Sequence, residues 1–97
     1  MKTVRFLDPA ERELLDAAVY YQRQSQGLGI DFLDKIEAAS DDIAQDPERW
    51  PPIRQGVRRR LIHRFPYALL YRIDPTGIVI LAVMHLHRRP DYWIDRQ

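Results

Sequence analysis

The sequence predicts an α+β domain in the order β-α-α-β-β-β, with an antiparallel helix pair packed on one face of a small, mainly antiparallel sheet. Two amphipathic stretches with helical spacing come first, and three runs of strand-forming residues separated by turn signals come last. The chain has 97 residues, of which 45% are hydrophobic, which is enough for one core. We therefore expect residues 1–97 to form a single domain.

A short strand and a helix open the chain. Weak alternation of apolar and polar residues predicts the strand over residues 3–7. The helix is expected to follow directly, because Asp8 is a good N-cap and Pro9 suits the first helical position. We expect Gly27 and Gly29 to form the turn that ends it.

The second helix is predicted from an amphipathic stretch that follows the two glycines. Its apolar stripe runs from Phe32 to Ile43, and its other face carries Asp34, Glu37, Asp41 and Asp42. The helix is expected to stop before Pro47, because the residue preceding a proline avoids the helical conformation. The short connection between the two helices favours an antiparallel pair.

Three strands complete the predicted sheet, after a proline-bearing loop over residues 46–56. They span residues 57–65, 67–73 and 78–86, and Asp74-Pro75-Thr76-Gly77 is a strong turn between the last two. The helix pair would cover one face of this sheet. We expect the other face to be partly open.

Charge is divided between the two halves of the chain. Residues 1–53 hold six Lys/Arg and eleven Asp/Glu, whereas residues 54–97 hold nine Arg, no Lys and three Asp. The net charge of +1 therefore hides an acidic first half and a basic second half. Because the guanidinium group binds phosphate or carboxylate through two hydrogen bonds, the second half is suited to a polyanion or an acidic protein.

The first candidate binding surface is an arginine cluster on the strand over residues 57–65. Strand alternation places Arg58, Arg60 and Arg64 on one face and Arg59 and His63 on the other. One interpretation is a solvated face paired with acids of the second helix. The other is a binding surface, which we favour because three like charges cannot all be buried without partners on the covered face.

Histidines near the end of the last strand are the second candidate. His85 and His87 share a strand face, but only Asp91 is near as a third ligand, so neither a metal nor a cofactor is expected. General acid–base chemistry and a structural hydrogen bond to the backbone both remain open for these imidazoles. Trp93 is expected to anchor the C-terminus to the sheet, and Tyr92 could stack on a base.

Several function classes are excluded by what the sequence lacks. It has no cysteine, no glycine-rich phosphate loop and no Gly-x-Ser-x-Gly motif. No apolar run approaches the length needed to span a membrane, and the N-terminus lacks a secretory signal, so we expect a cytoplasmic protein without a membrane partner.

Two segments resemble the RelE/ParE superfamily of toxins from type II toxin–antitoxin systems. Residues 57–72, with the sequence VRRRLIHRFPYALLYR, look like the central segment of these toxins. Residues 80–85, with Arg88-Arg89-Pro90 and Tyr92-Trp93, look like the closing segment of the ParE-like branch. The resemblance covers essentially the whole chain. It implies a small toxin that a cognate antitoxin neutralises in a toxin–antitoxin hetero-oligomer.

The resemblance leaves the target open between two classes. RelE-like toxins are ribosome-dependent mRNA endonucleases, and several ParE-like toxins poison DNA gyrase. The RelE pattern has lysines on the strand over residues 57–65, where this chain has none, and an arginine after the tyrosine of the next strand, where Ala68 follows Tyr67. We therefore favour gyrase inhibition without enzymatic activity. An inactive antitoxin-binding relic is a third alternative.

Two sets of site residues follow from these alternatives. The residues expected to bind the target or the antitoxin are Arg58, Arg59, Arg60, Arg64, Arg72, Arg88, Arg89 and Trp93. The residues expected to act if the protein cleaves mRNA on the ribosome are His63, His85, Arg88 and Tyr92.

Overall fold

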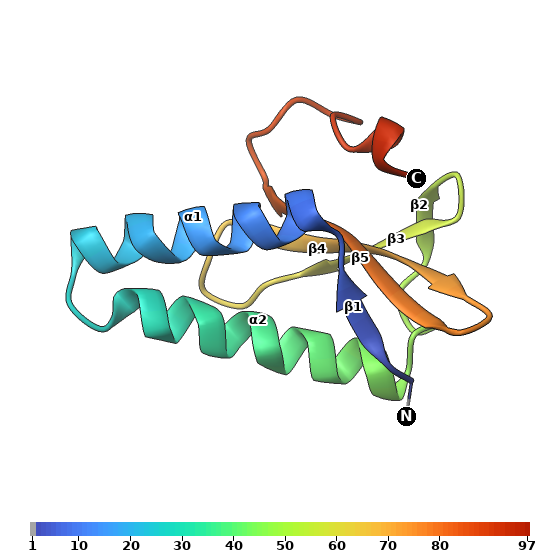
Figure 1. The fold of residues 1–97 in the computed structure, drawn as a ribbon, viewed down its shortest axis with the longest axis horizontal. Helices are drawn as coiled ribbons and strands as arrows, with labels where there is room; N and C mark the ends of the chain where they lie inside the picture. Colours follow the sequence, from blue (N-terminus) through green and yellow to red (C-terminus); the bar gives the residue numbers. More distant parts are fainter. Residues whose placement is uncertain (1) are drawn as a thin grey trace.

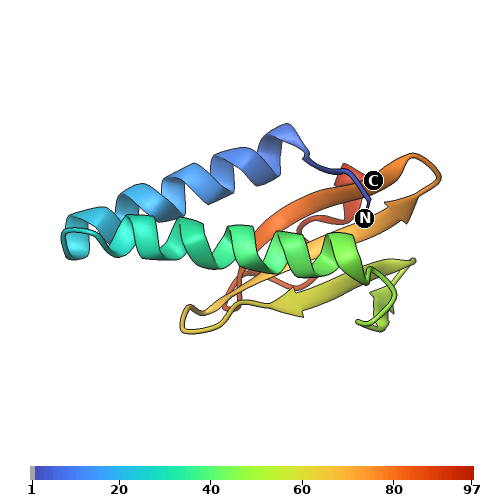
Figure 2. The same ribbon diagram turned by 90° about the horizontal axis from the view of Figure 1, so that it is seen from below.

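Two helices lie side by side on one face of a five-stranded sheet in the computed structural model, which describes residues 2–97 (Figures 1 and 2). The elements in chain order are β1 (Val4–Phe6), α1 (Asp8–Gln24), α2 (Leu28–Gln45), β2 (Pro52–Arg54), β3 (Val57–Leu61), β4 (Tyr67–Asp74), β5 (Gly77–His85) and a 3-10 turn (Ile94–Arg96). The strand order is β1-β5-β4-β3-β2, and only the β1–β5 pair is parallel. The predicted α+β class and the antiparallel helix pair are confirmed.

The edge strand β2 is an element that the sequence analysis assigned to a loop. Pro52 and Arg54 pair with the start of β3 across the two-residue turn Gln55-Gly56. Both turn residues have positive φ, 50° and 78°, as in the type I′ turn that joins two twisted strands. The strand was not predicted because proline disfavours strands in general. Proline is tolerated on an edge strand, where its missing N–H faces outward.

The connection between the helices is shorter than predicted. Gly27, with φ of 87°, precedes α2, but Gly29 lies inside that helix. The Gln22 side chain accepts hydrogen bonds from the N–H groups of Gly27 and Gly29, both at 3.1 Å, and so serves as the cap of α2. A Cβ atom at position 29 would lie 2.5 Å from the Ala18 carbonyl oxygen, so the missing side chain is what lets the helices approach.

The core is divided by the sheet into two layers. The larger layer lies on the side of the helices, which we call the helix face, and includes Phe32, Ile36, Ile43, Leu69, Tyr71, Ile80 and Val83. The smaller layer lies on the opposite side, the far face, and consists of Val57, Leu70, Leu81, Ala82 and Trp93. A bulge in the β4–β5 register puts two consecutive β5 residues, Leu81 and Ala82, on the far face.

The far face is partly open, as expected, because Arg59 pairs with Leu70 on this face and is exposed there. The segment after β5, residues 86–97, which we call the C-terminal segment, crosses it (Figure 1). Trp93 from this segment is only 2% exposed and packs against Leu70 and Leu81, which confirms that it anchors the C-terminus. The C-terminal segment therefore acts as a partial second layer over the sheet.

Candidate functional site

The arginines of β3 lie in other positions than the sequence analysis expected. The strand ends at Leu61, not at residue 65, because the chain turns towards β4 and Arg64 takes a positive φ of 74°. Arg64 therefore does not share a strand face with Arg58 and Arg60. Those two residues pair with Tyr71 and Leu69, whose side chains lie in the helix-face core, so both arginines are on the covered face.

Both arginines on the helix face are bound to nearby groups. Arg58 donates to the carbonyl oxygens of Trp50 at 2.6 Å and of Glu48 at 3.2 Å. Arg60 forms an ion pair with Asp42 of α2 at 2.6 Å and lies over the Trp50 ring, with its guanidinium carbon 5.4 Å from the centroid. Pairing with acids of the second helix, the interpretation not favoured from sequence, is therefore what the structure shows for Arg60.

The remaining binding candidates fall into three groups. The first group is exposed and consists of Arg59, Arg64, Arg88 and Arg89. Arg59 lies on β3, and the other three lie in loops. Arg72 is bound to Asp74 at 2.9 Å. Trp93 belongs to the core, and we no longer assign its side chain to a binding surface.

A pocket of about 300 Å³ lies between α1, the ends of β4 and β5, and the C-terminal segment. Its polar and aromatic lining comprises Glu13, Asp16, Tyr20, Tyr67, His85, Arg88 and Tyr92. Three of the four residues named for mRNA cleavage, His85, Arg88 and Tyr92, thus meet in one place. The fourth, His63, is exposed in the connection between β3 and β4 and does not line the pocket.

The histidine of the pocket is held by its neighbours. Its Nδ1 atom accepts the backbone N–H of His87 at 3.0 Å, so the neutral ring of His85 carries its proton on Nε2. The His85 ring also lies edge-on to Tyr67, with the ring centroids 5.0 Å apart. The structure therefore confirms the backbone hydrogen bond that the sequence analysis considered for a strand-end histidine.

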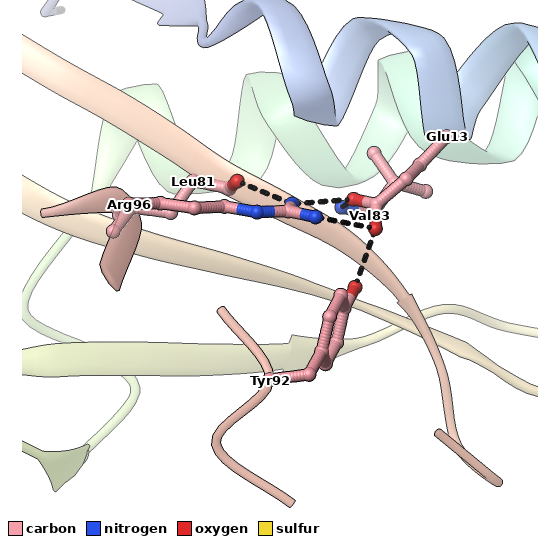
Figure 3. A network of polar contacts seen from close by, with 5 residues as sticks. All are labelled: Glu13, Leu81, Val83, Tyr92 and Arg96. Carbon is pink, nitrogen blue, oxygen red and sulfur yellow. Dashed lines mark hydrogen bonds and ion pairs between the residues drawn. The ribbon is translucent and has the colours of Figure 1, made fainter. Parts of the chain in front are cut away.

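Glu13, which lines the pocket, is the centre of a network of polar contacts (Figure 3). Arg96 binds the Glu13 carboxylate through two N–H groups, at 2.8 and 3.0 Å, and also donates to the Leu81 carbonyl oxygen at 3.0 Å. The Tyr92 hydroxyl donates to the same carboxylate at 2.7 Å, and the Val83 N–H donates to it at 3.0 Å. One carboxylate therefore binds a strand and two residues of the C-terminal segment.

This network also explains how the outer edge of β5 is satisfied. The neighbouring strand β1 pairs with β5 only as far as Ile80. Beyond that point the Val83 N–H donates a hydrogen bond to Glu13, and Arg96 donates one to the Leu81 carbonyl oxygen. These two side chains bind backbone groups of β5 that a neighbouring strand would otherwise bind. They therefore leave fewer unpaired backbone groups exposed at this edge of the sheet.

Of the three tyrosines that line the pocket, Tyr92 is the one bound to Glu13. Burial, together with the hydrogen bond to Glu13, raises the pKa of Tyr92 far above its ordinary value. The guanidinium carbon of Arg88 lies 3.9 Å from the Tyr92 ring centroid, in cation–π contact. The Tyr92 hydroxyl is therefore a hydrogen-bond donor that is already engaged by the Glu13 carboxylate.

Glu13 was missed by the sequence analysis, which treated it as one of eleven acids in the first half. A signal was present, because Glu13 lies beside the buried positions of α1, with Ala10 and Ala17 three residues before and four after it. An acid on the covered side of an amphipathic helix needs a partner. The partner Arg96 is 83 residues away along the chain, which no local pattern reveals.

Two general findings bear on the chemistry. Across residues 2–97, no three His, Cys, Asp or Glu side chains are grouped so that they could hold a metal ion. No helix in the same range is long and apolar enough to cross a membrane.

Comparison with known proteins gives a family and solved structures of the same fold. A family model described as the ParE toxin of the type II toxin–antitoxin system parDE matches residues 4–90. A solved chain described as a chromosomal ParDE TA system from P. aeruginosa superposes with a TM-score of 0.76 at 18% identity, over 90% of this chain and 98% of that one. At that identity the likeness shows the fold. No curated protein sequence matches.

Proposed function

Because the chain belongs to the ParE toxin family of type II toxin–antitoxin systems, we propose that it arrests growth by binding DNA gyrase and that a cognate antitoxin neutralises it. Gyrase is the target that similarity to the ParE-like branch implies. The toxin would act in the cytoplasm as a protein ligand, with no bond made or broken and no cofactor needed. Its potency then depends on the shape and charge of its surface.

The small number of cations in the pocket is the observation that favours gyrase over mRNA as the target. Among the residues that line it, Arg88 is the only Lys or Arg, and two carboxylates, Glu13 and Asp16, face the same space. A cleavage site needs donors aimed at the developing negative charge of the phosphate. Here the Tyr92 hydroxyl donates to Glu13, and the β3 cations on the helix face, Arg58 and Arg60, are bound to other groups.

The position of Ala68 adds to this argument. Its side chain is fully buried, with 0% exposure, on the strand that supplies Tyr67 to the pocket. No cation therefore reaches the pocket from the residue after the tyrosine, where the RelE pattern has an arginine. Loss of one such donor typically costs on the order of 10²-fold in rate.

The meeting of His85, Arg88 and Tyr92 supports mRNA cleavage as the second candidate. Imidazole can move a proton, and a guanidinium can stabilise a phosphorane, which is sufficient for attack by a ribose 2′-hydroxyl. This candidate requires Tyr92 to leave Glu13 when RNA binds. The resemblance to RelE-like toxins implies that such an activity would appear only with the ribosome present.

The antitoxin surface is supported by the exposed cations of the second half. Arg59, Arg64 and Arg89 are all exposed. None of the three forms an ion pair among the described residues. Free guanidinium groups of this kind suit an acidic segment, which would accelerate association and make affinity sensitive to salt.

The target is tested by purifying the toxin and measuring two activities side by side. We expect inhibition of gyrase supercoiling, together with a DNA-damage response and filamentous cells on induction, while translated transcripts stay intact. Rapid cuts in translated mRNA without DNA damage, abolished by His85→Ala, would establish the second candidate instead. Growth without arrest, with an antitoxin still bound, would identify an inactive relic.

The antitoxin surface is tested by co-purification from the native operon, followed by binding measurements at increasing salt. The double variant Arg59→Gln/Arg64→Gln should bind the antitoxin several-fold more weakly than wild type at low salt. The control is Arg12→Gln, which removes an exposed charge from α1. Equal weakening by the control, or no weakening by the double variant, would reject this surface.

A further inference from the structure

The Glu13 carboxylate joins three parts of the chain that are far apart in sequence (Figure 3). We propose that Glu13 is a positioning residue, which assembles the toxic surface around the pocket by fixing Tyr92 and, through it, Arg88. The proposal rests on the proposed function only in taking the pocket as part of the surface that meets the target.

The carboxylate has no capacity left for chemistry of its own. One oxygen accepts from Val83 and Arg96, and the other accepts from Tyr92 and Arg96. Both partners of the ion pair are largely buried, with side-chain exposures of 17% for Glu13 and 19% for Arg96. A carboxylate with four donors and little contact with water is suited to holding other groups in place.

The C-terminal segment depends on such an attachment for its position. It contains no helix or strand beyond the 3-10 turn at Ile94–Arg96, and Asp91 has a positive φ of 63°. Trp93 fixes the segment against the far face of the sheet, and the Tyr92 ring packs against the edge of the same far-face core. The Tyr92 hydroxyl donates from there to Glu13 of α1. Packing holds the body of the ring, and the bond to Glu13 fixes its hydroxyl end at the pocket.

The effect passes from Tyr92 to Arg88. The Arg88 side chain lies over the Tyr92 ring and is otherwise exposed, with no hydrogen bond or ion pair among the described side-chain contacts. Its position therefore follows that of the ring. Arg96 also lies over this ring, with its guanidinium carbon 4.9 Å from the centroid, so the same aromatic plane serves both cations.

The test uses the full chain with two variants and a matched control. Glu13→Gln keeps the size of the side chain but removes its charge, and Tyr92→Phe keeps the ring and the ion pair but removes the hydroxyl. Glu11→Gln makes the same change as the first variant at an exposed position of α1. Each protein is purified with its antitoxin, and its folded fraction is measured by thermal unfolding.

Two measurements report on position independently of the target. In Glu13→Gln, the nuclear Overhauser contacts between Arg88 and the Tyr92 ring should disappear, and the Val83 amide should exchange at least about tenfold faster, the factor for losing one charge-assisted hydrogen bond. In Glu11→Gln both should match wild type. Contacts and exchange that persist in Glu13→Gln would overturn the proposal.

Growth arrest separates positioning from a merely structural role. Per folded molecule, Glu13→Gln should be about tenfold less toxic than wild type. Tyr92→Phe should lose toxicity several-fold while melting close to wild type. Toxicity that falls only in proportion to the folded fraction would make Glu13 a structural residue. If wild type arrests growth without inhibiting gyrase, the proposed target fails, but the comparison of variants still decides the role of Glu13.

Discussion

On strand β3, arginines bound to neighbouring groups alternate with an arginine that is free. Arg58 and Arg60 point towards α2 and the Trp50 loop, where carbonyl oxygens and Asp42 bind them. Arg59 points the other way and is exposed. A run of three identical residues therefore contains two structural cations and one that a partner can reach, because successive strand residues face opposite sides.

Arg60→Gln is expected to destabilise the fold by about 1 kcal/mol, because it removes a half-exposed ion pair and a cation–π contact with Trp50. Arg59→Gln should change stability by less than about 0.5 kcal/mol. Chemical denaturation of the two variants and wild type makes the comparison. Identical unfolding midpoints for all three would mean that the contact with Asp42 contributes nothing.

A single buried hydroxyl is expected to set part of the alkaline stability limit. Tyr71 donates to the Pro47 carbonyl oxygen at 2.6 Å, and burial raises its pKa from 10.0 to about 12. Since the folded-state pKa is above the unfolded value, the stabilisation is complete below pH 10 and is lost as the pH rises from 10 to 12.

Tyr71→Phe should therefore be less stable than wild type at pH 7, by about 1 kcal/mol for the lost hydrogen bond. Its stability should also fall less steeply between pH 10 and 12. Urea unfolding at a series of pH values measures both effects. A variant that follows the wild-type curve throughout this range would show that Tyr71 does not control it.

At the scale of elements, the close approach of the two helices depends on one glycine. An alanine inside a helix normally gains about 1 kcal/mol over glycine. At position 29 the added Cβ would meet the Ala18 carbonyl oxygen at 2.5 Å, a backbone atom that cannot turn away. The steric cost must then be relieved by separating the helices over the core.

Gly29→Ala is accordingly expected to destabilise the protein by about 1–3 kcal/mol, the cost of an overpacked core contact. The reference is Ala38→Gly, at an exposed position of α2, which should cost about 1 kcal/mol through helix propensity alone. Thermal unfolding of both variants provides the measurement. A stabilised Gly29→Ala would show that the helices can move apart without loss of packing.

In the whole molecule, the sheet separates two hydrophobic cores of unequal size, one on each face. The helix pair covers one face, and the C-terminal segment covers the other with Trp93 as its main apolar contact. A strand layer with apolar residues on both faces needs cover on both. The toxin fold is therefore closed by a segment with almost no regular secondary structure.

Trp93→Ala is expected to cost about 3–5 kcal/mol, which is a large part of the stability of a domain of this size. Equilibrium denaturation should show this loss, and dye binding should report the exposed apolar surface of the far face. The partly buried Ile94 provides a milder control as Ile94→Ala. A loss below about 1 kcal/mol would mean that the C-terminal segment is not part of the cooperative fold.

The acidic first half and the basic second half of the chain are joined by ion pairs in the folded molecule. Acids of the first half bind cations of the second half in the pairs Asp42–Arg60 and Glu13–Arg96. The division seen along the sequence is therefore partly neutralised by folding. Four exposed arginines of the second half have no ion pair among the described residues, namely Arg88 at the pocket and Arg59, Arg64 and Arg89, which we propose bind the antitoxin.

The sequence by itself determined the fold class, the two helices and the last two strands, because periodicity and turn residues act over a few neighbouring positions. Asp74-Pro75-Thr76-Gly77 forms the β4–β5 connection, and α2 ends before Pro47, both as predicted. The resemblance carried by residues 57–72 and 80–93 likewise identified the family that the match over residues 4–90 shows.

Only the tertiary structure decided which polar groups are free and which are bound. The face of Arg60 depends on where β3 begins and ends, and an ion pair to Asp42 cannot be read from either position alone. The pocket requires the meeting of α1, β5 and the C-terminal segment, joined by Glu13 and Arg96. Local patterns fix local conformation, whereas the partners of a buried charge are set by packing between residues distant along the chain.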